Sequence, residues 1–180
     1  MASDLKLSSI DFGVVIAFVA PGFVAFQAIS YHMPTAGAWM SAASERDQSV
    51  GVFLFVLLAS LSLGLVVSGV RALVIDKLFC WPRLPWGLSV QHYTIDWSKV
   101  DENKLLVLTT IRDNFYRYYQ FYSNSVVALV VWALARSYST EPYLSCLQIA
   151  LIVGGIVALL LSSRQSLHLY VTALEKVFQS

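Results

Sequence analysis

Residues 50–70 read VGVFLFVLLASLSLGLVVSGV, and this run contains no charged side chain. An α-helix rises about 1.5 Å per residue, so about 20 apolar residues are enough to cross the hydrocarbon core of a bilayer. Serine is the only polar side chain in the run. The stretch therefore predicts a membrane-spanning helix.

Three other apolar stretches flank this one, at residues 12–29, 123–135 and 144–161. Stretch 123–135 is the shortest and continues backward into an aromatic run. Together they predict an all-α polytopic membrane protein with four transmembrane helices and a small helical cytoplasmic part. We expect four parts: a first transmembrane hairpin (1–75), a cytoplasmic loop and helix (76–117), a second hairpin (118–162) and an amphipathic tail helix (163–180).

The composition of the whole chain agrees with this prediction. Of 180 residues, 57% are hydrophobic and only 13% are charged, against about 25% charged in a typical soluble domain. The mean hydropathy is +0.66. A soluble globule of this size exposes roughly a third of its extended surface, so it could not hide so many apolar groups. Disordered chains, soluble nucleic-acid binders and disulfide-rich secreted domains are thereby excluded.

The basic residues predict the orientation in the membrane. With four spans, ten of the twelve Lys and Arg fall on one side of the bilayer and only Arg46 and Arg136 on the other. Basic residues gather on the cytoplasmic side of membrane proteins. We therefore expect both termini in the cytoplasm, with the protein in a bacterial inner membrane.

Two helices are expected to extend beyond the bilayer. No proline or glycine interrupts residues 101–139, so the third span is predicted to continue a cytoplasmic helix that starts near Asp101, with Ser98 or Asp101 as its N-cap. The tail 163–180 has one apolar face, which includes Leu167 and Tyr170. Two arrangements fit this face. The tail either lies flat on the inner leaflet or packs against residues 105–111, and packing is the favoured alternative.

No catalytic motif is present, so the chain is not expected to be an enzyme. The sequence lacks HExxH, GxSxG, P-loop and GxGxxG patterns. His32, His92 and His168 lie in three different segments, and Cys80 and Cys146 lack the CxxC spacing of a metal site. No metal or other cofactor is expected. A net charge of +1 gives no reason to expect direct contact with nucleic acid.

Small residues at four-residue spacing suggest close helix packing. They occur on the first span (Gly13, Ala17, Pro21, Ala25), the second (Ser60, Gly64, Ser68) and the fourth (Cys146, Ala150, Gly154, Ala158, Ser162). Such ridges let helices approach closely in lipid, either within one subunit or between subunits. The Pro21-Gly22 pair should bend the first span, because proline frees a backbone carbonyl. The helix-packing or pore candidates are Pro21, Gly22, Gln27, Gly64, Asn124, Gly154 and Ala158.

The densest group of polar and aromatic residues precedes the third span. Arg112 and Arg117 could pair with a phosphate, while Tyr118 and Tyr119 stack on a base, which would make a pocket for an anionic ligand. The other interpretation is an aromatic belt at the membrane surface with arginines that extend to the headgroups.

Two stretches resemble small bacterial four-span proteins of unassigned function: Ala20-Pro21-Gly22-Phe23 and residues 112–122, RDNFYRYYQFY. In general plan the chain also resembles membrane subunits of prokaryotic antiviral systems. These resemblances and the ridges suggest a homo-oligomeric protein, channel-like or membrane-perturbing, that is controlled through its cytoplasmic helices. The alternative is a membrane anchor or sensor that recruits a soluble partner protein. In both cases the lipid bilayer is a partner.

Overall fold

The computed structural model describes residues 13, 15–44, 50–79, 101–139 and 144–179, and all regular structure in these ranges is helical. This confirms the all-α prediction. The elements, in chain order, are η1 (Val15–Val19), α2 (Ala20–Ser30), α3 (Pro34–Ser44), α4 (Val50–Phe79), α5 (Glu102–Ile111), η3 (Arg112–Tyr116), α6 (Arg117–Ser137) and α7 (Cys146–Gln179). Here η denotes a π-helical turn. Residues 80–100, most of the expected cytoplasmic loop, lie outside the described ranges.

The predicted long helix before and through the third span is present. Asp101 caps its start, because the Asp101 carboxylate accepts a hydrogen bond of 2.7 Å from the Lys104 amide. α5, η3 and α6 then follow one another without a break as far as Ser137. The π turn at η3 is marked by the Arg117 amide, which donates to the carbonyl of Arg112, five residues earlier.

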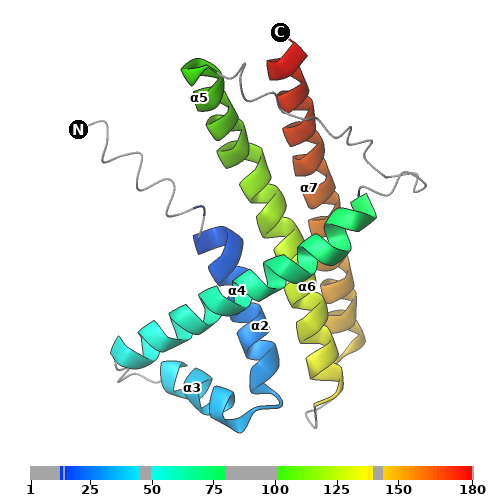
Figure 1. Cartoon of the computed structure of the whole chain (residues 1–180). Helices are drawn as coiled ribbons and strands as arrows, with labels where there is room; N and C mark the ends of the chain where they lie inside the picture. The colour runs from blue at the N-terminus through cyan, green and yellow to red at the C-terminus, as the bar shows by residue number, and fades with distance from the viewer. Residues whose placement is uncertain (1–12, 14, 45–49, 80–100, 140–143, 180) are drawn as a thin grey trace.

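The tail continues the fourth apolar stretch without interruption, since α7 is one helix of 34 residues. The C-terminal half of α7 packs against the α5–α6 helix. Leu167 is buried in the main core, and the Tyr170 ring lies 5.1 Å from the Tyr116 ring. α5 and α7 are also in contact and lie side by side (Figure 1). Of the two arrangements left open by the sequence, the structure has the packed one.

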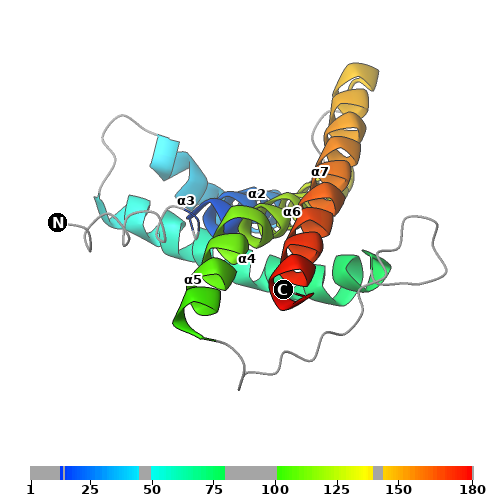
Figure 2. The same cartoon turned by 90° about the horizontal axis from the view of Figure 1, so that it is seen from above.

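Helix α4 lies across the other helices instead of parallel to them, as the view along α5 and α7 makes clear (Figure 2). Because of this crossing, only one face of α4 is covered. Its buried residues are Val56, Ser60, Gly64, Val67, Arg71, Ile75 and Phe79. Residues of this face form the main core together with residues of α2, α6 and α7. Its members are Ala25, Val67, Ile75, Phe79, Tyr119, Val126, Val127, Ala128 and Leu167.

Two helices, α4 and α7, are long and apolar enough to cross a membrane, rather than the four that the sequence predicted. The first stretch forms a shorter apolar helix, Ile16–Ser30. α6 carries tyrosines, Asn124 and two arginines among its 21 residues, which makes it less apolar. In the most apolar windows of α4 and α7 only 22% and 6% of the residues are buried. A core helix of a soluble protein would be mostly covered, so these exposed faces suit a lipid environment.

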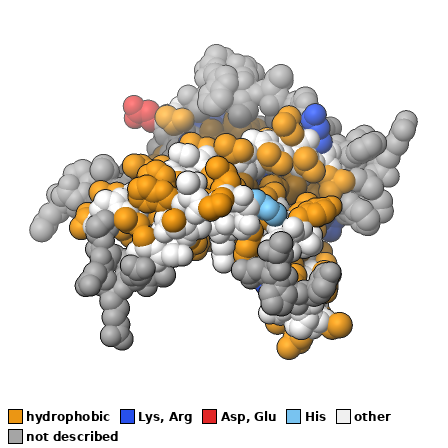
Figure 3. Space-filling view, turned by 90° about the horizontal axis from the view of Figure 1, so that it is seen from below, with side chains coloured by type: hydrophobic (Ala, Val, Ile, Leu, Met, Phe, Trp, Pro, Cys, Tyr) orange, Lys and Arg blue, Asp and Glu red, His pale blue; other side chains and the backbone are white. Residues whose placement is uncertain are grey.

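The bundle has two distinct ends in Figure 1. At one end, here named the α5 end, α5 begins and α7 finishes. At the other, named the α3 end, α2 and α6 finish, α7 begins and α3 lies alongside. α3 was not expected from the sequence. Trp39 on α3 stacks against Phe55 on α4, with ring centres 4.2 Å apart. Seen from the α3 end, the surface shows mainly hydrophobic and uncharged groups (Figure 3).

Candidate functional site

Helices α2 and α4 meet backbone to backbone at Gly22 and Gly64. A Cβ atom on Gly22 would overlap the Ser60 carbonyl and lie 2.6 Å from the backbone nitrogen of Gly64. A Cβ atom on Gly64 would overlap the carbonyl of Phe18, 2.7 Å from its carbon. Only hydrogen fits at either position, so the Cα–H groups face carbonyl oxygens of the opposite helix. The small residues of the first and second stretches therefore pack within one chain.

The Pro21 kink is joined to a third helix by Asn124. Proline has no amide hydrogen, so the carbonyl of Ala17, four residues earlier, lacks its helical donor. The Asn124 side chain on α6 donates to this carbonyl at 2.8 Å and is completely buried. The π turn η1 covers the same residues. Pro21, Gly22, Gly64 and Asn124 are thus brought together in one three-helix contact.

A buried polar cluster lies nearer the α5 end. Arg71 on α4 is only 4% exposed, and its guanidinium lies 3.6 Å from the Asp76 carboxylate and over the Tyr119 ring. The Tyr119 hydroxyl donates to the other oxygen of Asp76. Two guanidinium nitrogens of Arg71, Nε and Nη1, are buried without a hydrogen-bond partner. The cluster fastens α4 to α6 inside the bundle.

Sequence reasoning did not single out this cluster. It treated Arg71 as a loop cation that contributes to the orientation, because Arg71 is the first charge after residues 50–70. The pattern that could have found it is the spacing of the covered residues of α4. Arg71 follows Ser60, Gly64 and Val67 on one helical face. A charge on the packing face of an apolar helix needs a partner, and Asp76 is the next acidic residue.

The four residues predicted to form an anionic-ligand pocket occupy different environments. Arg117 pairs with Asp113 at 3.1 Å and covers Gly13, where a Cβ atom would overlap the arginine. Arg112 lies 3.4 Å from the same carboxylate and is more exposed. Tyr118 is exposed, whereas Tyr119 is buried against Asp76. The arginines share one carboxylate, and the two tyrosines lie on different faces of α6.

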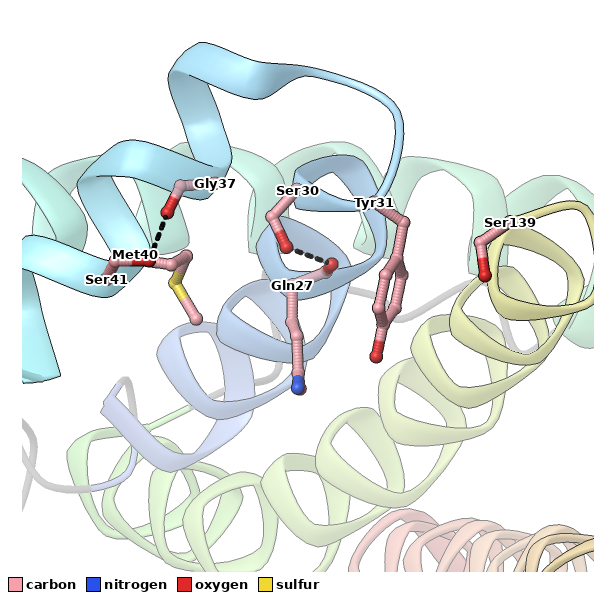
Figure 4. Close-up of a pocket in the computed structure, with 7 residues that line it drawn as sticks. All are labelled: Gln27, Ser30, Tyr31, Gly37, Met40, Ser41 and Ser139. Atoms are coloured by element: carbon pink, nitrogen blue, oxygen red, sulfur yellow. Dashed lines mark hydrogen bonds between the residues drawn. The ribbon is translucent and has the colours of Figure 1, made fainter. Parts of the chain in front are cut away.

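A cavity of about 340 Å³ opens at the α3 end, between the end of α2, helix α3 and the end of α6 (Figure 4). Gln27, one of the pore candidates, lines it. The full lining is Gln27, Ser30, Tyr31, Gly37, Met40, Ser41 and Ser139. None of these residues is Asp, Glu, Lys, Arg or His. The volume is at the small end of the range for ligand sites.

The rim of this cavity is aromatic and basic. The guanidinium of Arg136 lies over the Tyr31 ring, 5.4 Å from its centre, and Trp132 meets the same ring edge to face. His32 bonds the Ala135 carbonyl through Nε2 at 3.0 Å. These contacts tie the end of α2 to the end of α6. They hold one wall of the cavity in place.

The small-residue ridge of α7 has no helix against it within the chain. Gly154 and Ala158 are exposed, and a Cβ atom on Gly154 would meet nothing within 4 Å. Cys146 and Ala150 on the same ridge are exposed too. This ridge therefore differs from the one at Gly64, which another helix covers.

The described residues contain no group of three His, Cys, Asp or Glu side chains that could hold a metal ion. No family model, curated protein or solved structure matches the chain. Its function is therefore argued from the geometry of its helices.

Proposed function

We propose that this chain is a homo-oligomeric integral membrane protein, channel-like or membrane-perturbing, that is controlled through its cytoplasmic helices. In this proposal all four apolar helices lie in a bacterial inner membrane with both termini in the cytoplasm, and α5 and the end of α7 form the controlling part. The general plan of antiviral membrane subunits suggests a role in defence.

The observation that supports self-association is the exposed ridge of α7. Small residues allow close contact between helices in lipid, where van der Waals packing rather than water exclusion drives association. The equivalent residues around Gly64 are already used within the chain. Gly154 and Ala158 remain open on α7, whose most apolar window has only 6% of its residues buried. A second copy of α7 would fill this ridge.

The arrangement of the helices supports four crossings. α2 and α6 run from the α5 end toward the α3 end, whereas α7 runs back and α4 runs back at a slant across the bundle (Figure 1). α2 and α6 are both in contact with α4, and α6 also packs along α7. The described basic residues near the α5 end include Arg112, Arg117 and Lys176, while Arg136 lies near the α3 end. This distribution favours a cytoplasmic α5 end.

Gly154→Leu tests the interface. We expect cysteine or amine cross-linking of the full chain in membranes to give oligomers for the natural sequence and monomers for this variant. Gly69→Leu is the matched control, because Gly69 is an equally open glycine on α4. Oligomers that persist in Gly154→Leu would contradict an α7 interface.

Ion flux from proteoliposomes tests the action on the bilayer. The natural chain, with cell extract as the source of its trigger, should release ions or dye, and Gly154→Leu should release less. Release equal to that of empty liposomes under every condition would contradict the channel-like activity while leaving self-association standing.

A second candidate function, recruitment of a soluble partner, has its own observation. α5 exposes Leu105, Leu106 and Val107. Such a patch outside the bilayer suits a protein contact. A soluble protein that co-purifies in fixed ratio, and is lost in Leu105→Glu, would favour this function. If the soluble protein is also lost in the exposed control Glu102→Ala, its binding does not depend specifically on the apolar residues of α5.

A further inference from the structure

The cavity at the α3 end has the chemistry of a binding site for neutral hydroxyl groups. Gln27 supplies an amide with two donor hydrogens and an acceptor oxygen, and Tyr31 supplies a hydroxyl. Within the described residues neither of these two polar groups takes part in a hydrogen bond. In Figure 4 both side chains extend in the same direction from the end of α2. Their free hydrogen-bonding capacity is therefore available to a bound molecule.

The serines of the cavity act as acceptors. The Ser30 hydroxyl donates to the Gln27 carbonyl at 2.7 Å, and the Ser139 hydroxyl donates to the Arg136 carbonyl at 2.9 Å. Since their hydrogens are engaged, their oxygens retain lone pairs for an incoming O–H group. Together with the donor hydrogens of Gln27, the site can both donate to and accept from a ligand. A hydroxyl group has this double character, whereas a carboxylate or an ammonium group does not.

Charge lies beside the cavity rather than in it. The guanidinium of Arg136 lies over the ring of Tyr31, one of the lining residues. A ligand that places uncharged hydroxyls among Gln27, Ser30 and Ser139 would place an adjoining anionic group near this guanidinium. Arginine is well suited to a phosphate oxygen.

We propose that this cavity binds a polyol group that adjoins a phosphate. Two sources have this chemistry: the headgroup of a glycerol-type phospholipid and a soluble glycerophosphate ester. The position of the cavity does not by itself distinguish the lipid from the soluble ester. The choice of the lipid rests on the proposed function, in which the α3 end lies at the outer face of the membrane, where headgroups are abundant.

Lipid binding to the full-length chain in detergent micelles, measured by native mass spectrometry, tests the proposal. Phosphatidylglycerol is compared with phosphatidic acid of the same acyl chains, because the two lipids differ only in the headgroup glycerol. We expect phosphatidylglycerol to bind roughly five- to tenfold more tightly, the effect of one or two hydrogen bonds. Gln27→Leu with Tyr31→Phe should reduce this ratio to about one.

A filled cavity provides a second test with a close control. Ser139→Phe should abolish the preference, whereas Ser137→Phe should retain it, because Ser137 makes the same kind of hydroxyl bond to a carbonyl three residues earlier but is exposed and outside the cavity. Melting temperatures of all variants should stay near that of the natural chain, which separates loss of the site from loss of the fold.

Deacylated glycerophosphoglycerol distinguishes the two sources. Competition with the lipid at equal concentration assigns a soluble ester, and no competition assigns the lipid headgroup. Equal binding of phosphatidic acid and phosphatidylglycerol by the natural chain, or an unchanged preference in Ser139→Phe, would overturn the proposal. This assay measures lipid binding at the cavity, and its result does not depend on the number of subunits or on the orientation in the membrane. Its failure is therefore distinct from failure of the cross-linking test.

Discussion

The α2–α4 crossing and the outer face of α7 carry similar small residues but differ in what covers them. At the crossing, Gly22 and Gly64 leave room only for hydrogen between two backbones. On α7, Gly154 has no atom of the chain near its missing side chain. The same sequence pattern therefore marks a completed contact in one place and an unused surface in the other. Substitutions at the two places should separate effects on folding from effects on assembly.

The largest effect is expected at the crossing. Gly22→Leu should lower the free energy of unfolding by about 3 kcal/mol, because the new side chain must separate two helices. Unfolding by SDS in mixed micelles measures this. Gly69→Leu, the same change at an open position, should leave stability unchanged or slightly higher, since leucine favours helix more than glycine does. Equal stability of the two variants would mean that α2 and α4 do not touch as described.

The next effect concerns the polar cluster that joins α4 to α6. Tyr119→Phe removes the hydroxyl that donates to the Asp76 carboxylate and should cost about 2 kcal/mol, as for hydrogen bonds to charged groups. Tyr118→Phe is the control, because Tyr118 is the exposed neighbour. The same SDS titration applies. If the two substitutions lower the free energy of unfolding by the same amount, the buried hydrogen bond between Tyr119 and Asp76 contributes nothing to stability.

A smaller effect is expected at the proline kink. Asn124→Leu should cost about 1 kcal/mol, in the range of hydrogen bonds between membrane helices. Pro21→Ala restores the amide that can bond the Ala17 carbonyl within the helix. In the double variant the cost of Asn124→Leu should therefore fall, and a double-mutant cycle measures the difference. Strict additivity would show that Asn124 does not act through the freed carbonyl.

The smallest effect on folding is expected on the α7 ridge. Gly154→Leu should change the stability of the monomer by less than about 0.5 kcal/mol, as for other exposed positions. Measurement in a detergent that keeps the chain monomeric isolates this quantity. A loss of more than about 1 kcal/mol would indicate that the ridge packs within the chain after all.

Local features of the sequence were the predictable part of the fold. The absence of breakers between residues 101 and 139 predicted one long helix, and Asp101, one of two expected caps beside Ser98, is the cap that the structure has. Proline chemistry predicted a free carbonyl near Pro21. Each of these depends on residues within a turn or two of one another.

Contacts between distant segments were not predictable. Asn124 lies 107 residues after its acceptor Ala17, and no periodicity connects them. Arg71 was counted as a loop cation because the apolar run ends at residue 70, but the helix continues to Phe79 and buries Arg71. The cavity at the α3 end is formed partly by α3, a helix that was not expected from the sequence. Gln27 was noticed as a polar residue in an apolar stretch, but the cavity it lines became visible only with α3 and Ser139 in place.

The π turn η3 carries one residue more than an α turn would, and it sits where α5 joins α6. Taking that residue out, for example by deleting the exposed Asn114, should leave a regular helix in which α5 and α6 keep their present faces, because five residues of a π turn and four of an α turn close about the same angle. Most single deletions in a helix disturb the packing on both sides. Here the π turn already accommodates the extra residue, so the deletion should be tolerated, and disulfide trapping between α5 and α7 should give the same residue pairs before and after it.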